Sequence, residues 1–257
     1  MKIDRVLAPN PGPFTGPGTN TWLLRSGGEA IVIDPGPVDR RHADAILRQV
    51  EPGEVKAVLV THTHEDHAPL ANPLGRELDV PALGHAPGPG FDPDERVDEG
   101  RALKVGDVEL RVVHTPGHSD DHLCFLVDRV LFTGDHIMGG SSVMVDRMAP
   151  YLESLERVRR LDLERLYPGH GEVIDDPETV IDWYLAHRRQ REAEIRAAVE
   201  EGASSIDAIL EVVYRDVDRA LFPLAARSVA AHLEKLEAEG VLVTRGEKVE
   251  LLVGGER

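Results

Sequence analysis

Three histidines and one aspartate stand within six residues, immediately after an apolar run in the first third of the chain. The run covers residues 58–60, and the cluster contains His62, His64, Asp66 and His67. An apolar β-type run predicts a buried strand, and side chains that follow a strand end start from a rigid platform. Imidazole nitrogens and carboxylate oxygens suit zinc and other first-row divalent ions, whereas hydrophobic packing has no use for four of them. The chain is therefore expected to fold around a sheet that carries a metal site at the ends of its strands.

Three later segments repeat this design, in which an apolar run is followed by a turn of small residues and a ligand-capable side chain. They are His114-Thr-Pro-Gly-His118 after residues 108–113, Gly134-Asp135 after residues 130–132, and Pro168-Gly-His170-Gly after Leu166-Tyr167. Each segment alone is an ordinary turn, because proline and glycine mark turns and an aspartate often caps a helix. Four strand ends that open on one edge of a sheet would make a single metal site.

Short strands and helices alternate through the first 176 residues. Helical spacing begins at Ala43 and ends before Pro52-Gly53, and a second amphipathic stripe begins at Tyr151. Residues 86–100 are rich in proline, glycine and acidic side chains and are expected to form an exposed loop. The mixture predicts an α/β domain of layered sheets and helices over residues 1–176. Its strands are predicted at residues 21–24, 30–33, 57–60, 108–113, 123–127 and 130–132.

The sequence pattern changes after Asp176. Residues 178–201 predict one long charged helix, and helical spacing returns at residues 206–213 and 229–236. Two short β-type runs, at residues 241–243 and 249–253, predict a hairpin. Helices followed by a hairpin are typical of a winged-helix module, so residues 177–257 are interpreted as a second domain.

The last predicted helix of this module makes DNA an unexpected partner. It carries Arg227 and Lys235 against Glu234, Glu237 and Glu239. Because DNA binding depends on cationic side chains that neutralise phosphates, such a helix is a poor surface for reading DNA. The role of the module stays open.

Composition narrows the classes of function. The chain has 257 residues, 29 basic and 46 acidic side chains, and a formal net charge of −17. Bulk neutralisation of phosphates needs clustered lysine and arginine, so nucleic-acid binding through net charge is not expected. No apolar stretch approaches the roughly 18 residues of a membrane helix, and the N-terminus lacks the apolar run of a secretory signal. These features predict a cytoplasmic protein without membrane contact.

The single cysteine, Cys124, limits the chemistry further. One cysteine excludes a disulfide framework within the chain and a structural zinc site built from several cysteines. It lies in the middle of a predicted strand and is expected to be a buried, inert thiol.

The ordered motifs His-Thr-His-Glu-Asp-His, His-Thr-Pro-Gly-His, Gly-Asp and Pro-Gly-His-Gly resemble those of the metallo-β-lactamase fold superfamily. This resemblance implies an αββα sandwich with two metal ions at one edge and a C-terminal winged-helix-like module. Residues 10–21 and 115–122, with that module, resemble the β-lactamase-like protein 2 branch over nearly the whole chain. Asp66 and Asp135 are the catalytic residues that the resemblance implies. By match to the family motifs, one ion is expected at His62, His64 and His114, the other at Asp66, His67 and His170, with Asp135 as a bridge.

The implied activity is hydrolysis. Asp135 stands where the main zinc β-lactamases have a cysteine, so the resemblance favours an oxygen-bridged pair of ions. It implies a dinuclear hydrolase that uses a metal-bound hydroxide on a small ester, thioester or lactone. Zinc is the preferred ion, with manganese and iron as alternatives, because histidine and aspartate accept all three. A small-molecule substrate is the expected partner, and its identity and any self-association of the chain stay open.

Two other functions remain as alternatives. The first is a single-strand endoribonuclease of the β-lactamase-like protein 2 type, which would take RNA as its substrate. The second is a mononuclear iron persulfide dioxygenase, which shares the His-x-His-x-Asp-His motif. Metal analysis separates the second alternative from a hydrolase with two ions.

Three further histidines near the expected ligands are interpreted separately from the metal site. His118 and His122 are interpreted as outer hydrogen-bonding partners of the ligands or as turn residues, because metal-bound imidazoles usually need such partners. His136 follows the bridging aspartate, and it either lines the substrate cleft or has a structural role.

Overall fold

The structure is a computed structural model that describes residues 1–140 and 142–252. The chain divides into two units. The first contains Met1–Pro116, Asp121–Val143 and Arg160–Val180, and the second contains Gly117–Asp120, Met144–Arg159 and the chain from Ile181 onward. Neither unit is one uninterrupted stretch of sequence. The predicted division between residues 176 and 177 stays a prediction.

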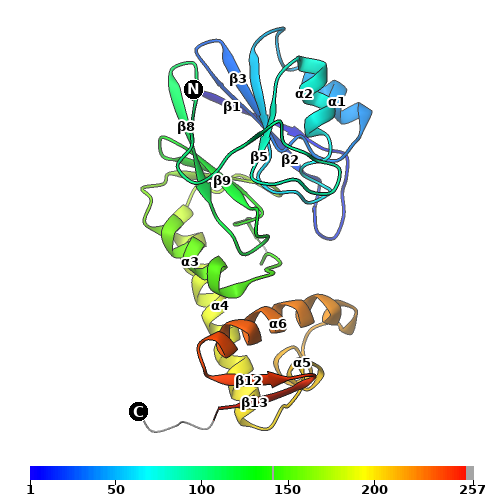
Figure 1. Cartoon of the computed structure of the whole chain (residues 1–257), viewed down its shortest axis with the longest axis vertical. Helices are drawn as coiled ribbons and strands as arrows, with labels where there is room; N and C mark the ends of the chain where they lie inside the picture. The colour runs from blue at the N-terminus through cyan, green and yellow to red at the C-terminus, as the bar shows by residue number, and fades with distance from the viewer. Residues whose placement is uncertain (141, 253–257) are drawn as a thin grey trace. The chain divides into compact units, whose positions relative to one another are not determined.

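Two β-sheets form the first unit (Figure 1). Strands β3 to β6 run parallel, as do β10 and β11, while β8 and β10 share a direction because both are antiparallel to β9. Strands that run the same way end at the same edge of their sheet, so the segments after β3 and β4 leave one edge of the first sheet, and those after β8, β10 and β11 leave one edge of the second. The first sheet has the order β1 (Lys2–Leu7), β2 (Asn20–Ser26), β3 (Glu29–Ile33), β4 (Val55–Leu59), β5 (Ala82–Gly84), β6 (Glu95–Arg96), and the second has the order β11 (Arg165–Pro168), β10 (Val130–Gly134), β9 (Leu123–Val127), β8 (Val108–His114), β7 (Ala102–Val105).

A hydrophobic core fills the space between the two sheets. Alternate residues of each strand point inward, as the period of two in a strand requires. Trp22 packs edge-on against Tyr167, with ring centroids 5.0 Å apart, and its indole N–H donates to the carbonyl of Pro168 at 3.0 Å. The remaining core side chains include Leu24, Ile31, Ile33 and Leu59 from the first sheet and Leu110, Val112, Phe125, Val127 and Phe132 from the second.

Two short helices cover the outer face of the first sheet. They are α1 (Arg40–Leu47) and α2 (Ala71–Leu78), and Asp39 caps α1 by accepting from the backbone N–H of Arg41. Ile46 and Leu74 are buried in the same cluster as residues of β2, β3 and β4. These strands are therefore covered on both faces, which explains why their sequences are continuous apolar runs rather than alternating polar and apolar residues.

The second unit contains helices and a hairpin. Helix α4 continues from the first unit into the second, and Ile195, Ile209, Val229 and Leu242 bring α4, α5, α6 and β12 into one hydrophobic cluster. The predicted succession of helices and hairpin is confirmed, although Val253, the last residue of the predicted hairpin, lies outside the described residues. The elements are α3 (Met148–Arg159), α4 (Pro177–Glu200), α5 (Ile206–Val213), the 3-10 turn Arg219–Leu221, α6 (Phe222–Ala238), β12 (Leu242–Arg245) and β13 (Lys248–Leu251).

Several elements differ from the sequence predictions. Helix α1 lies three residues earlier than the pattern indicated, because Asp39 provides the N-cap. The predicted loop at residues 86–100 contains the short strand β6, which pairs with β5. Strands β1, β5 and β7 and helix α2 were not predicted, since each is short and only partly apolar.

No helix among residues 1–140 and 142–252 is long and apolar enough to cross a membrane.

Candidate metal centre

The loop after β4 carries most of the candidate ligands. His62 and His67 are buried, Asp66 is half-buried and His64 is exposed. Asp135 follows β10 and His170 follows β11, so parallel strands bring both to the same edge. A backbone hydrogen bond from Gly169 to Gly134, 2.8 Å, ties these two segments together.

Two glycines make room for this close approach. A Cβ atom on Gly134, where φ is +46°, would lie 2.6 Å from the Thr61 hydroxyl and 2.8 Å from Nε2 of His122. A Cβ atom on Gly169 would lie 2.7 Å from the Asp135 carboxylate. Both positions therefore need glycine, which explains the Gly-Asp and Pro-Gly-His motifs in packing terms.

Four donor atoms from Asp66, His67, Asp135 and His170 form a tight cluster. His67 Nε2 lies 3.2 Å from His170 Nε2, 3.5 Å from Asp66 Oδ2 and 3.4 Å from Asp135 Oδ1. His170 Nε2 lies 3.1 Å from Asp66 Oδ2 and 3.4 Å from Asp135 Oδ1. Ligands about 2.0–2.1 Å from a tetrahedral ion are separated by about 3.3 Å, so these spacings match the edges of a zinc-sized coordination shell.

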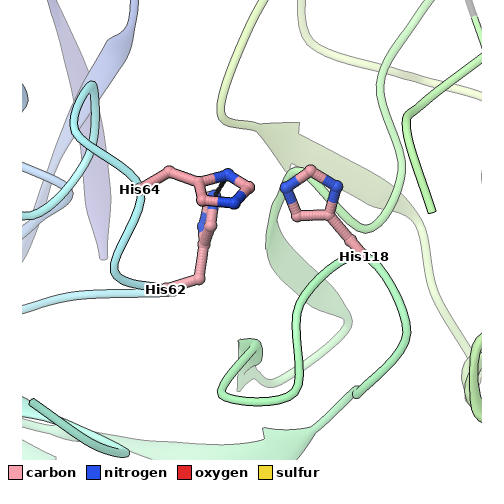
Figure 2. Close-up of side chains that lie close together, drawn as sticks. All are labelled: His62, His64 and His118. Atoms are coloured by element: carbon pink, nitrogen blue, oxygen red, sulfur yellow. Dashed lines mark hydrogen bonds between the residues drawn. The ribbon is translucent and has the colours of Figure 1, made fainter. Parts of the chain in front are cut away.

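A second group of donors lies next to the first. The rings of His62 and His64 approach each other, with His62 Nε2 2.9 Å from His64 Nδ1, and Figure 2 shows both with His118 beside them. The nitrogens of His62, His64 and His118 lie within 4.8 Å of one another, as do donor atoms of His62, His67 and Asp135. His62 and Asp135 therefore connect two potential ion positions.

His114, which the resemblance implied as a ligand, lies elsewhere. It is the last residue of β8, its ring stacks on His85 with centroids 4.6 Å apart, and its backbone N–H donates to Glu99 at 2.7 Å. Among the described residues, no group of potential metal ligands includes His114. The histidine beside His62 and His64 is His118, four residues later, after the Thr-Pro-Gly turn. The interpretation of His118 as an outer partner is therefore replaced by one in which it is a candidate ligand.

Asp34 supports the centre and was not singled out from the sequence. It follows β3, is 1% exposed, and its Oδ2 lies 3.0 Å from Nδ1 of His67. Its other oxygen accepts from the backbone N–H of Thr61 at 2.7 Å. The available signal was its position after a strand parallel to β4, because the ends of parallel neighbours meet.

His122 and His136 are buried near Asp135. Nε2 of His122 accepts the backbone N–H of Asp135 at 3.1 Å, and Nδ1 lies 2.9 Å from the Thr115 hydroxyl. A backbone N–H can only donate, so His122 must be neutral with its proton on Nδ1. His122 thus holds the Asp135 backbone, in line with its interpretation as a support. His136 is fully buried, which favours its structural role over cleft lining.

Electrostatics couple the four clustered donors. Burial alone would lower the pKa of His67, but Asp135, Asp34 and Asp66 raise it well above its ordinary value. Burial alone would raise the pKa of Asp135, but the cationic His67 and His170 lower it well below its ordinary value. The same partners outweigh burial at Asp66 and lower its pKa to about 2. At His170, the two carboxylates outweigh burial and raise the pKa to about 9.

The residues fit a divalent cation. Two carboxylates and two imidazoles buried together need positive charge between them, and without an ion they obtain it from protons on the imidazoles. A divalent cation would supply that charge and displace those protons. The donor types suit zinc, manganese or iron, and their spacing matches a zinc-sized shell.

Comparisons with known proteins agree with this arrangement. Residues 14–170 match the family described as "Metallo-beta-lactamase superfamily", and residues 205–248 match the "Beta-lactamase associated winged helix domain". The chain is 34% identical over 261 residues to a Beta-lactamase-like protein 2 homolog of Drosophila melanogaster, which covers 93% of this chain and 89% of the relative. It is 33% identical to an atrochrysone carboxyl ACP thioesterase of a Cryptosporiopsis species, over 78% of this chain and 63% of that protein.

A solved structure supports the fold. The crystal structure of a Beta-lactamase domain protein from Burkholderia ambifaria superposes with a TM-score of 0.82 at 27% identity, over 97% of this chain and 91% of that one. The predicted sandwich and the winged-helix domain are thereby confirmed. The chain belongs to the metallo-β-lactamase superfamily, in its β-lactamase-like protein 2 branch, and is a hydrolytic enzyme of that superfamily.

Proposed function

We propose that this enzyme uses two divalent cations to cleave a small thioester, ester or lactone. The observation that carries the proposal is the spacing of 3.1–3.5 Å among the donor atoms of Asp66, His67, Asp135 and His170. The thioesterase name of one relative supports an acyl thioester as substrate. In this proposal, His62, His64 and His118 would hold one ion and Asp66, His67 and His170 the other, and Asp135 would lie between the two groups of ligands.

The role of each carboxylate follows from its exposure. When bound, the two cations would lower the pKa of a water molecule and stabilise the oxyanion that develops on the substrate carbonyl. The Asp66 side chain is 28% exposed and that of Asp135 is 11% exposed. Asp66 is therefore the carboxylate that can orient the attacking water and accept its proton. Asp135, between the two groups of donors, sets the separation of the ion positions.

Replacing Asp135 tests the site directly. The variant Asp135→Ala is expected to lose one equivalent of metal per chain and at least about a hundredfold in kcat, because both ions depend on this carboxylate. Metal content by elemental analysis and hydrolysis of an acyl thioester are the two measurements.

A surface carboxylate provides the matched control. Asp175→Ala removes an exposed side chain that pairs with Arg165 at 2.6 Å and lies outside the site. This control should keep both metal equivalents and full hydrolysis. If Asp135→Ala also kept both, the bridging role proposed for Asp135 would be wrong.

Metal analysis and a substrate panel separate the competing functions. Acyl thioesters, lactones and unstructured RNA should be assayed side by side with zinc and with manganese. Turnover of RNA alone would favour the endoribonuclease, and one iron per chain with oxygen uptake would favour the persulfide dioxygenase.

We further propose that residues 1–176 carry the chemistry and that residues 177–257 form a separate module.

A further inference from the structure

A buried hydrogen-bond network lies behind the metal centre, and Thr61 is at its middle. Thr61 precedes His62 and is 1% exposed. Its hydroxyl donates to Oδ2 of Asp34 at 2.7 Å and lies 3.0 Å from Nδ1 of His62. We propose that this network fixes His62 and His67 with the proton on Nδ1 and the lone pair of Nε2 facing the metal centre. The purpose of this arrangement rests on the proposed function, but the arrangement itself is tested without any substrate.

The first step concerns His67. Asp34 presents an acceptor to it, since Oδ2 also receives the Thr61 hydroxyl proton and Oδ1 receives the Thr61 backbone proton. A carboxylate oxygen that already receives another donor can serve Nδ1 of His67, 3.0 Å away, only as an acceptor. When a cation displaces one proton of His67, the proton that remains therefore sits on Nδ1. The lone pair is then on Nε2, which lies among the clustered donors.

The second step extends the same logic to His62. A threonine hydroxyl has one proton, and Thr61 gives its proton to Asp34. The contact of 3.0 Å between this hydroxyl and Nδ1 of His62 must then be donated by the histidine. One carboxylate thus sets the tautomers of two candidate ligands, one directly and one through Thr61.

The third step explains what holds Asp34. Its backbone has a φ of +51°, a strained conformation for an aspartate, and the Thr21 hydroxyl donates to its carbonyl at 2.7 Å. Since that proton is used, Nε2 of His42 must donate to the Thr21 hydroxyl, 2.8 Å away. His42 is 1% exposed and burial lowers its pKa, so it stays neutral and donates a single proton. The network therefore runs from His42 to both ligands with every donor direction determined.

The wrong tautomer would direct an N–H group at a cation and block coordination. Positioning partners of metal ligands typically contribute 10- to 100-fold in metal affinity. Thr61 and Asp34 are thus positioning residues, which act on the ions through His62 and His67 rather than by contact.

The test compares two substitutions at one position. Thr61→Val keeps the shape of the side chain and removes the hydroxyl, whereas Thr61→Ser keeps the hydroxyl and removes a methyl group. Zinc affinity and stoichiometry are measured by competition with a chelator, and the tautomer of His62 by imidazole ¹⁵N shifts of the zinc-free protein above pH 9. We expect Thr61→Val to lower zinc affinity by about 10- to 100-fold and to lose the Nδ1–H form of His62. Thr61→Ser should stay within about threefold of the wild type and keep that form.

Two results would overturn the proposal. One is wild-type zinc affinity in Thr61→Val, and the other is an unchanged Nδ1–H signal of His62 in that variant. If Thr61→Val does not fold by circular dichroism, Asp34→Asn gives the second test. An amide N–H in place of Oδ2 would donate to the Thr61 hydroxyl, which would then donate to Nδ1 of His62, so this variant should also lose the Nδ1–H form of His62. An unchanged Nδ1–H signal of His62 in Asp34→Asn would equally overturn the proposal. Since no readout uses hydrolysis, inactivity on every substrate would count against the proposed function alone.

Discussion

Close packing at Gly134 links the backbone of the site to its ligands. The space that a Cβ would occupy is already taken by the Thr61 hydroxyl and His122. We therefore expect Gly134→Ala to reduce the free energy of unfolding and to weaken zinc binding, because both neighbours must move. Gly100 has a similar positive φ of +79° but open space around it, so Gly100→Ala reports the backbone penalty alone.

The two glycine variants can be compared by chemical denaturation and zinc titration. Gly100→Ala should cost about 1–2 kcal/mol for a left-handed alanine and leave zinc binding unchanged. Gly134→Ala should cost about 1–3 kcal/mol more through overpacking and weaken zinc binding. Equal stability and zinc affinity in the two variants would contradict the importance of the close approach.

At this scale the sequence predicted most of the candidate site. His62, His64, Asp66 and His67 were found because four ligand-type residues in six positions have no packing explanation. The sequence could not predict whether His114 or His118 approaches His62, because the conformation of the turn between them decides which side chain points toward the site. Asp34 was missed because its partner Thr61 is 27 residues away in sequence and adjacent only once β3 and β4 pair.

Among the elements, α4 and α6 share a buried polar contact that should make the second unit sensitive to acid. Nδ1 of His232 lies 3.2 Å from Glu192, which also pairs with Lys235 at 2.8 Å. His232 is fully buried, and its Nε2 has no hydrogen-bond partner among the described residues. Burial, with a smaller contribution from Arg188 and Lys235, lowers the pKa of His232 despite Glu192.

The direction of the pH effect follows from this lowered pKa. As the pH falls below the ordinary histidine value of about 6.5, the unfolded chain takes up a proton that the folded chain does not. The free energy of unfolding should therefore decrease between pH 7.5 and 5.5. His232→Asn keeps a donor near Glu192 but cannot titrate, so its decrease over this range should be smaller. Denaturant unfolding of the second unit, followed by Trp183 fluorescence, gives the free energy of unfolding of the wild type and of His232→Asn at each pH. Equal pH dependence of the two proteins would contradict the role of His232.

The sequence predicted long, strongly patterned elements better than short ones. The apolar runs of β4, β9 and β10 and the stripes of α5 and α6 appear where they were expected. Strand β1 was missed because only one of its six residues is buried. Strands β5 to β7 were missed because two to four residues carry too little pattern, and pairing with neighbours decides their conformation.

For the whole molecule, the net charge of −17 should influence which substrates reach the site. A negative field slows the approach of anions and is screened by salt. Raising the ionic strength from about 0.01 to 0.15 M shortens the Debye length from about 30 to 8 Å. We expect kcat/KM for an anionic acyl thioester to rise at least about twofold over this range, and that of a neutral one to stay constant. A fall for the anionic substrate would indicate a local basic surface that outweighs the net charge.

The position of Cys124 has a practical consequence for such assays. This residue is the chain's single cysteine, and it is completely shielded within β9. A chromogenic disulfide reagent would therefore react with the mercaptan released from a cleaved thioester and not with the folded enzyme. Turnover can be followed continuously at high enzyme concentration, and storage in air should not cross-link the preparation.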